Sequence, residues 1–214
     1  MNRLTLVACV LCTTMANAAD YPKHDHLFPE FSEFAFGGAF PPDVPTRDFA
    51  ELYKPNVVAR MIADMSFLGE YGVGITNDGG NFGVISHRRY LSGTRKRTLC
   101  RAPIDRDLAI RAIGAWRKVL LGTRFSDDVE TGADGGTFHF SMMETFQQPH
   151  GVAQKVPWFG MVWSPDPQSP PFQLVKLAEG LGELCAVQDA GHRGELTRAL
   201  TKAADRLVAG TSSR

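Results

Sequence analysis

The stretch GGTFHFSMME, residues 135–144, sets a single histidine between two phenylalanines. Alternation of this kind predicts a β-strand, on which the phenylalanines share one face and His139 points to the other face with Thr137 and Ser141. An imidazole held out in this way can serve as a general base in hydrolysis or as a binding residue. A plain solvent-facing strand position has the same pattern, so both interpretations of His139 stay open.

The remaining side chains that could do chemistry form no recognised signature. Besides His139, the histidines are His24, His26, His87, His150 and His192. The sequence has no HExxH, paired CxxC, GxSxG or SxxK motif. In a hydrolase, acidic residues of 127–134 could partner His139, and the sequence alone does not place them across a cleft. We therefore expect no metal and no cofactor.

The cysteines are considered together with the first residues, MNRLTLVACVLCTTMANAAD. Arg3, a short apolar run and a small-x-small site match the three regions of a signal peptide, with cleavage after Ala18. Cleavage would leave Cys100 and Cys185. In an oxidising compartment two cysteines most simply form one disulfide, with two separate buried thiols as the alternative. We thus predict a periplasmic or secreted protein.

Charge and hydropathy exclude two kinds of partner. The chain has 23 basic and 23 acidic residues, so no net field would attract nucleic acid or anionic lipid. Beyond the leader no apolar run reaches the ~20 residues of a membrane-spanning helix, so we expect no membrane insertion after cleavage.

A local exception is the basic series from His87 to Arg101. Arg88 and Arg89 are binding candidates there for an acidic partner or an anionic cell-wall polymer. The alternative is a charged edge strand that resists aggregation.

Residues 19–45 combine phenylalanines with prolines and glycines, which oppose both a long helix and a central strand. They predict an irregular arm. Phe28, Phe31 and Phe34 are binding candidates, because so apolar a segment must cover either its own domain or a partner.

Tight turns and alternating apolar residues predict the strands. Residues 70–76 and 81–87 flank Asn77-Asp78-Gly79-Gly80, the sequence of a β-hairpin turn. An edge strand follows near 94–102, and 137–143 is expected to pair with 158–163. Residues 56–68 fit a helix or a strand equally.

Helical periodicity predicts helices over 105–121, 170–185 and 194–208, after a short one near 46–53. The first long helix has Asp105 as N-cap and Gly122 as an expected left-handed C-cap. Strands joined by tight turns imply an antiparallel sheet, so we predict an α+β fold with helices packed on one face of a small sheet. The expected organisation is leader 1–18, arm 19–45, one domain 46–209 and a loose tail 210–214.

The segments GGTFHFS, GMVWSP and FQLVKLAEGL, preceded by AIRAIGAWRKVLLGTR, resemble uncharacterised exported proteins of proteobacteria. Those proteins carry a Tyr/Phe-His-Phe-Ser strand, a Thr-Trp-Ser-Pro strand end and a Leu-Val-x-Leu-Ala helix. The resemblance covers about residues 105–185, and Val162 stands where they tend to have threonine. It implies a small α+β domain and no activity, substrate or catalytic residue.

These observations favour an exported protein without enzymatic activity that binds an envelope or secreted protein, with an inhibitor or immunity factor as examples. An envelope hydrolase around His139 and a structural envelope component are the alternatives. The sequence predicts no oligomeric state.

Overall fold

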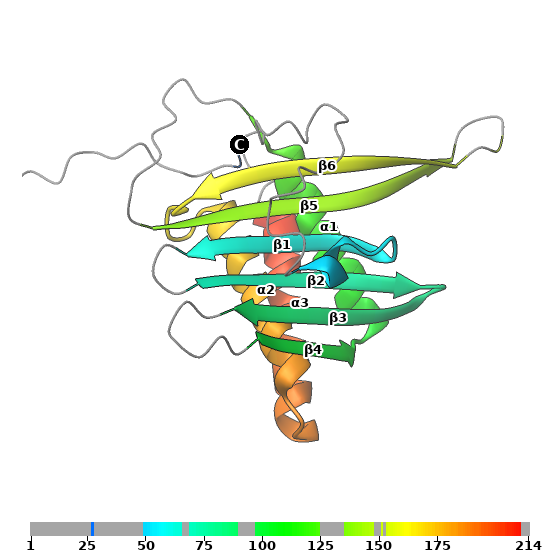
Figure 1. Cartoon of the computed structure of the whole chain (residues 1–214), viewed down its shortest axis with the longest axis vertical. Coiled ribbons are helices and arrows are strands. Elements are labelled where there is room, and N and C mark those ends of the chain that lie inside the picture. Colours follow the sequence, from blue (N-terminus) through cyan, green and yellow to red (C-terminus); the bar gives the residue numbers. More distant parts are fainter. Residues whose placement is uncertain are drawn as a thin grey trace, which may run out of the picture.

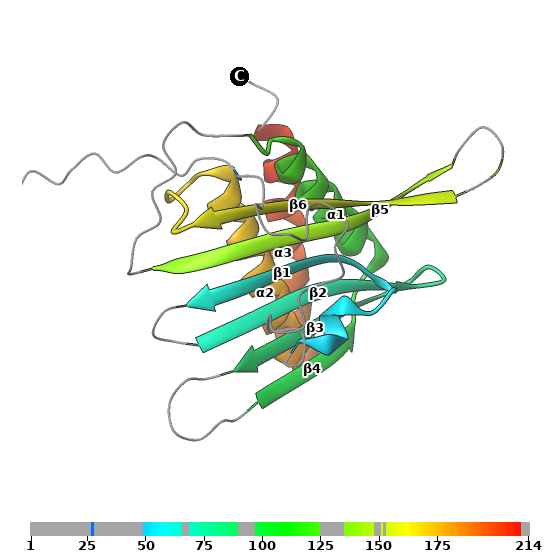
Figure 2. The same cartoon turned by 45° about the horizontal axis from the view of Figure 1, so that its top comes forward.

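The computed structural model describes residues 27, 49–65, 69–89, 97–124, 135–147, 151 and 153–210. Within them, six strands form one antiparallel sheet and three helices pack on one of its faces, which confirms the predicted α+β fold (Figure 1, Figure 2). The strands are β1 (Val57–Met65), β2 (Gly69–Asp78), β3 (Asn81–Arg89), β4 (Arg97–Pro103), β5 (Gly136–Gln147) and β6 (Ala153–Trp163). The helices are α1 (Arg106–Leu121), α2 (Pro170–Ala186), α3 (Ala190–Gly210) and the short 3-10 helix η3 (Ala50–Tyr53). The expected leader, and the expected arm apart from Leu27, lie outside the described residues.

The strand order is β4-β3-β2-β1-β5-β6, so β1 lies between β2 and β5. It has buried side chains on both faces, with Met61 fully buried on the helix side and Ile62 only 8% exposed on the other. A strand covered on both faces reads as a continuous apolar run, which is why residues 56–68 were ambiguous between helix and strand.

The hairpin between β2 and β3 is confirmed, and its turn has the chemistry that its sequence predicts. Gly79 and Gly80 have φ angles of 61° and 95°, a conformation that costs glycine little. The Asn77 side-chain oxygen accepts a hydrogen bond of 2.8 Å from the Gly80 amide. The turn therefore fixes the register Asp78↔Asn81 from which the two strands run.

Side-chain caps set where the helices begin. The Asp105 carboxylate accepts from the Asp107 and Leu108 amides, as predicted, and the Ser169 hydroxyl accepts from the Phe172 amide at the start of α2. The start predicted for α3 was late by four residues, because the Asp189 carboxylate accepts from the His192 amide and begins the helix at Ala190.

The left-handed cap predicted at Gly122 is wrong. Gly122 has a φ angle of −85°, and its amide donates to the Val119 carbonyl. A tightened last turn thus ends α1, which satisfies the final carbonyls without a left-handed residue.

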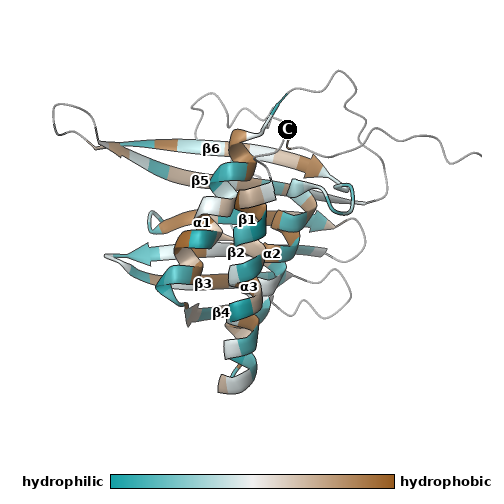
Figure 3. Ribbon diagram, turned by 180° about the vertical axis from the view of Figure 1, so that it is seen from behind, coloured by the Kyte–Doolittle hydropathy of each residue, from teal (hydrophilic) through white to brown (hydrophobic). Residues whose placement is uncertain are grey.

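The main core lies between the sheet and the helices. Phe138 and Phe140 point into it from β5, as the alternation predicts, and Trp116 of α1 meets Phe140 edge-on at 6.3 Å between ring centroids. The Trp116 indole N–H donates to the Arg60 carbonyl, so its polar atom is satisfied. Leu27 is also fully buried in this core. Seen from the helix side, α1 and α3 carry many hydrophilic residues among the hydrophobic ones (Figure 3).

A disulfide joins Cys100 of β4 to Cys185 near the end of α2, with Cα atoms 6.0 Å apart. The predicted pairing is confirmed. Because α2 lies over β3 and β4, the bond fixes the edge of the sheet to the helical layer.

Candidate functional site

The sheet face opposite the three long helices is here called the open face. Residues on it alternate with core residues along each strand, so its composition follows directly from the register. Two parts of it differ in chemistry. Over β1–β3 it is covered by η3, and over β5–β6 it carries mixed polar and aromatic side chains.

The cover over β1–β3 depends on glycines that lack side chains. Phe49 and Leu52 pack against Gly72, where an added Cβ would lie 2.3 Å from the Leu52 Cδ1 atom. Arg60 of β1 holds η3 in place, since its guanidinium donates to the Leu52 carbonyl at 3.0 Å and stacks 4.0 Å from the Tyr53 ring centroid. Phe49 and Leu52 are fully buried.

His87 belongs to this covered part. Its ring meets Phe49 edge-on, with centroids 5.0 Å apart, and it is only 7% exposed. Of the predicted basic series, His87 and Arg88 point to opposite faces of β3, because successive residues of a strand alternate, and residues 90–96 lie outside the described residues. Arg88 lies over the Tyr71 ring on the helix side, while the side chain of Arg89 lies outside the described residues.

His139 stands on the open face at the centre of the β1–β5–β6 segment, as the alternation predicts. Its register partners are Ile62 on β1 and Met161 on β6. Thr137 and Ser141 flank it on its own strand, and it is half-buried.

A carboxylate and a guanidinium are placed near His139 by the register. Asp64 lies opposite Thr137 and Arg60 opposite Ser141, which makes both of them diagonal neighbours of His139. The acidic stretch 127–134 that the hydrolase hypothesis requires lies outside the described residues, as do Phe28, Phe31 and Phe34. The hydrolase hypothesis therefore stays a prediction.

A charged cavity of about 450 Å³ opens beside η3 on the open face. Its charged lining residues are Glu51, Lys54, Asp78 at the β2–β3 turn, and Arg101 of β4. Glu51 forms ion pairs with both Lys54, at 2.7 Å, and Arg101. Hydrogen bonds from Lys54 and Arg101 hold the pKa of the Glu51 carboxyl below its usual value. Both cations remain about half exposed, so they can also meet a ligand.

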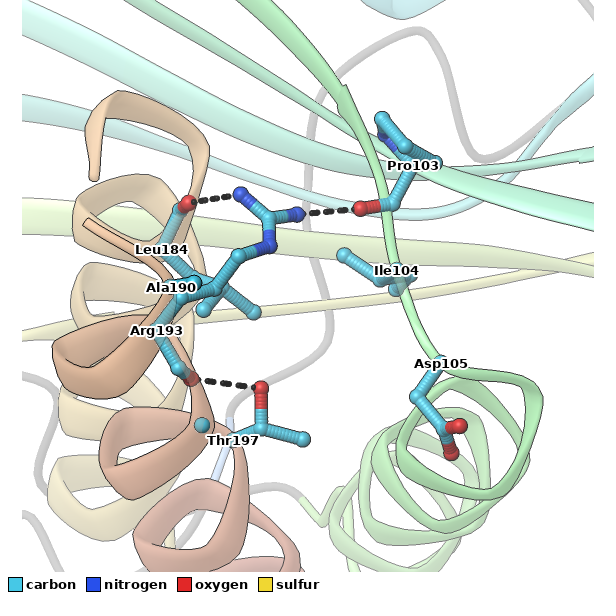
Figure 4. Close-up of a pocket in the computed structure, with 8 residues that line it drawn as sticks. Pro103, Ile104, Asp105, Leu184, Ala190, Arg193 and Thr197 are labelled. Carbon is cyan, nitrogen blue, oxygen red and sulfur yellow. Dashed lines mark hydrogen bonds between the residues drawn. The ribbon is translucent and has the colours of Figure 1, made fainter. Parts of the chain in front are cut away.

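A second cavity of about 310 Å³ lies on the helix side, between β4, the end of α2 and α3 (Figure 4). Arg193 dominates it. Its guanidinium donates to the Leu184 and Val187 carbonyls at the end of α2 and to the Pro103 carbonyl at the end of β4. These bonds make Arg193 a clamp between β4 and α2, and Asp105, also in the wall, caps α1. The polar groups of this cavity thus serve the fold.

Neither of these two cavities is lined by His139. Within the part of the chain that the structure describes, no three His, Cys, Asp or Glu side chains are grouped to hold a metal ion. The described helices also include none that is long and apolar enough to cross a membrane.

No sequence pattern indicated the charged cavity. Glu51, Asp78 and Arg101 are far apart along the chain and meet only because η3 folds back over β2, β3 and β4. Of the segments that line this cavity, the Asn77-Asp78-Gly79-Gly80 turn was the one that the sequence pattern had identified. No protein-family model matches the chain, and no curated protein and no solved structure matches it either.

Proposed function

We propose that this chain is an exported protein of the cell envelope that binds another protein through the open face of its sheet. The observation that carries the proposal is the difference between the two faces of the sheet. The helices and the main core cover one face, while the β5–β6 part of the other presents half-buried His139, Phe159 and Met161. Aromatic residues, methionine and histidine on a broad sheet surface are suited to a macromolecule, because a small substrate needs an enclosing pocket.

Export is supported by the disulfide between Cys100 and Cys185, since such bonds persist in oxidising compartments and are rare in the cytosol. The predicted leader with cleavage after Ala18 and the resemblance to exported proteobacterial proteins agree with it. Both remain predictions.

Site-specific photocrosslinking in the native envelope tests the binding. A benzophenone amino acid replaces Met161 on the open face, and the matched control places it at Lys202, an exposed position of α3. We expect one discrete protein adduct from position 161 and none from position 202. The same pattern from both positions, or no adduct from either, would remove the proposal. An adduct present at full stoichiometry in every growth condition would favour the structural component instead.

A further inference from the structure

The charged cavity beside η3 separates its charges into two groups. In one group, Glu51 pairs with both Lys54 and Arg101, so these three residues keep one net positive charge. The other group has the negative charge of Asp78, whose carboxylate accepts two hydrogen bonds from the neutral Asn56 amide, at 2.9 and 3.1 Å. The charges of the lining residues therefore cancel in sum, and the cavity is polarised along its length.

The sheet register gives the distance between the two groups. Asp78 lies opposite Asn81 of β3, and Arg101 lies opposite Ile85, four residues further along the same strand. At about 3.3 Å per residue, these two positions are about 13 Å apart along β3. A ligand that contacts both groups must therefore be elongated, with its own charges several ångströms apart.

The floor of the cavity provides a third polar group. Thr76 of β2 lies opposite Gly83 and is only 8% exposed. Its hydroxyl has no hydrogen-bond partner among the described residues, although Thr76 lines the cavity. Gly83 leaves room above this hydroxyl, since an added Cβ would lie 2.8 Å from the Thr76 Oγ1 atom. A buried hydroxyl without a protein partner is costly unless water or a ligand supplies the hydrogen bond.

Charge, length and floor together fit one class of ligand. A simple anion or cation complements only one end of the polarised cavity, whereas a molecule with separated opposite charges complements both ends. A short free peptide carries such charges at its termini, and its backbone spans up to about 3.3–3.6 Å per residue. The cavity volume of about 450 Å³ is within the range of small-ligand sites.

We propose that the charged cavity binds a free peptide of two or three residues as its zwitterion. The peptide carboxylate lies at Arg101 and Lys54, the ammonium group at Asp78, and a main-chain amide at Thr76. This proposal is independent of the proposed function. The cavity lies beside η3 over β3 and β4, whereas the protein-binding part of the open face lies over β5 and β6.

The probe is trialanine, titrated into the folded, disulfide-bonded chain at neutral pH and followed by calorimetry. The controls are N-acetyl-trialanine, which lacks the ammonium group, and trialanine amide, which lacks the carboxylate. We expect free trialanine to bind, and each blocked peptide to bind roughly tenfold more weakly or worse, because each loses a charge-assisted hydrogen bond. Absence of binding by free trialanine, or undiminished affinity for either blocked peptide, would overturn the proposal.

Charge-neutralising variants locate the two ends of the bound peptide. Asp78→Asn should weaken binding of free trialanine roughly tenfold and leave the weaker binding of N-acetyl-trialanine unchanged, because that peptide has no ammonium group. Arg101→Gln should weaken free trialanine and spare trialanine amide for the corresponding reason. Glu195→Gln and Arg206→Gln, at exposed positions of α3, change the net charge equally and should leave all affinities unchanged. Equal effects of Asp78→Asn on the free and the acetylated peptide would end the proposal.

The variant Thr76→Val tests the floor with little risk to the fold. Valine has nearly the shape of threonine and favours strands, so the variant should unfold at no lower urea concentration than the wild type. It should weaken trialanine binding roughly three- to tenfold, because one hydrogen bond is lost. Undiminished affinity in Thr76→Val would show that the peptide does not lie across the floor and would overturn its placement between the two ends.

Discussion

Phe140 and His139 are successive residues of β5 whose side chains lie on opposite faces of the sheet. Phe140 is fully buried against Trp116, while His139 is half-buried on the open face between Ile62 and Met161. The two residues are adjacent on one strand and differ in burial and in the face of the sheet that they occupy. Substitutions at them can therefore be compared directly.

The first prediction concerns this pair. Phe140→Ala should cost about 3–5 kcal/mol, because it leaves a cavity in the main core. His139→Ala should cost much less, since the open face loses only a half-buried side chain. Urea unfolding at neutral pH measures both. Equal losses would mean that β5 is not oriented as described.

The same His139→Ala variant tests the hydrolase alternative. If the protein is an envelope hydrolase using His139, the folded variant should lose activity by several orders of magnitude. Retention of every activity that the wild type shows would exclude that function.

The disulfide gives a second stability prediction. It closes a loop of 85 residues, for which the loss of chain entropy in the unfolded state corresponds to roughly 4–5 kcal/mol as an upper value. Cys100→Ser with Cys185→Ser should lower the free energy of unfolding by about 2–4 kcal/mol. Dithiothreitol should destabilise the wild type similarly and leave the double variant unaffected. An unchanged midpoint of urea unfolding, both for the double variant and for the wild type in dithiothreitol, would contradict the disulfide.

Close packing of η3 gives a third prediction. Gly72→Ala should destabilise the protein by about 1–3 kcal/mol, because the new methyl group would overlap Leu52. Leu52→Ala in the same chain should recover part of this loss, so the double-mutant cycle should show coupling. Gly194→Ala on α3 is the control: nothing lies within 4 Å of its added Cβ, and alanine favours the helix by up to about 1 kcal/mol.

A fourth prediction concerns alkaline pH. The Tyr71 hydroxyl donates to Glu179 of α2 at 3.1 Å, and burial, followed by the charge of Glu179, raises the pKa of Tyr71 above its usual value. A group whose pKa is raised by folding contributes stability that is complete below its unfolded pKa, about 10, and that declines as the pH rises further.

Tyr71→Phe should therefore flatten the fall in stability above pH 10 and cost about 1 kcal/mol at neutral pH for the lost hydrogen bond. Unfolding free energies at pH 8, 10 and 11 measure this, with the absorbance at 295 nm reporting tyrosinate. Ionisation of all four tyrosines at pH 10 in the folded protein would disprove the assignment.

Local patterns were sufficient for most elements of the fold. The Phe-His-Phe alternation, the Asp105 cap and the Asn-Asp-Gly-Gly turn each specify their own few residues, and the structure has them as expected. The pairing of Cys100 with Cys185 was predictable because the expected cleavage leaves these two cysteines alone, and the structure has the bond. The start of α3 was predicted too late. Asp189 caps the helix by accepting a hydrogen bond from the His192 amide, and the apolar periodicity of the helix does not extend back to that residue.

Relations between distant segments could not be predicted. Nothing local in β5 says that it pairs with β1 and not with β4. Likewise, Gly72 and Gly74 look like weak points of a strand, and only the packing of Leu52 on them explains why side chains are missing there. The charged cavity also depends on the packing of η3 against β2. Sequence patterns could not predict it, because they do not show which distant segments meet.

The position of β1 has a consequence for biogenesis. Among the described strands it comes first in the sequence, yet one of its two neighbours, β5, follows only after β2, β3, β4 and α1. A nascent chain therefore cannot pair β1 with β5 until residues 136–147 have been synthesised, and pairing of segments so distant in the sequence is also slow. In the exported protein proposed above, such late closure would keep the chain unfolded enough to pass through a translocation channel.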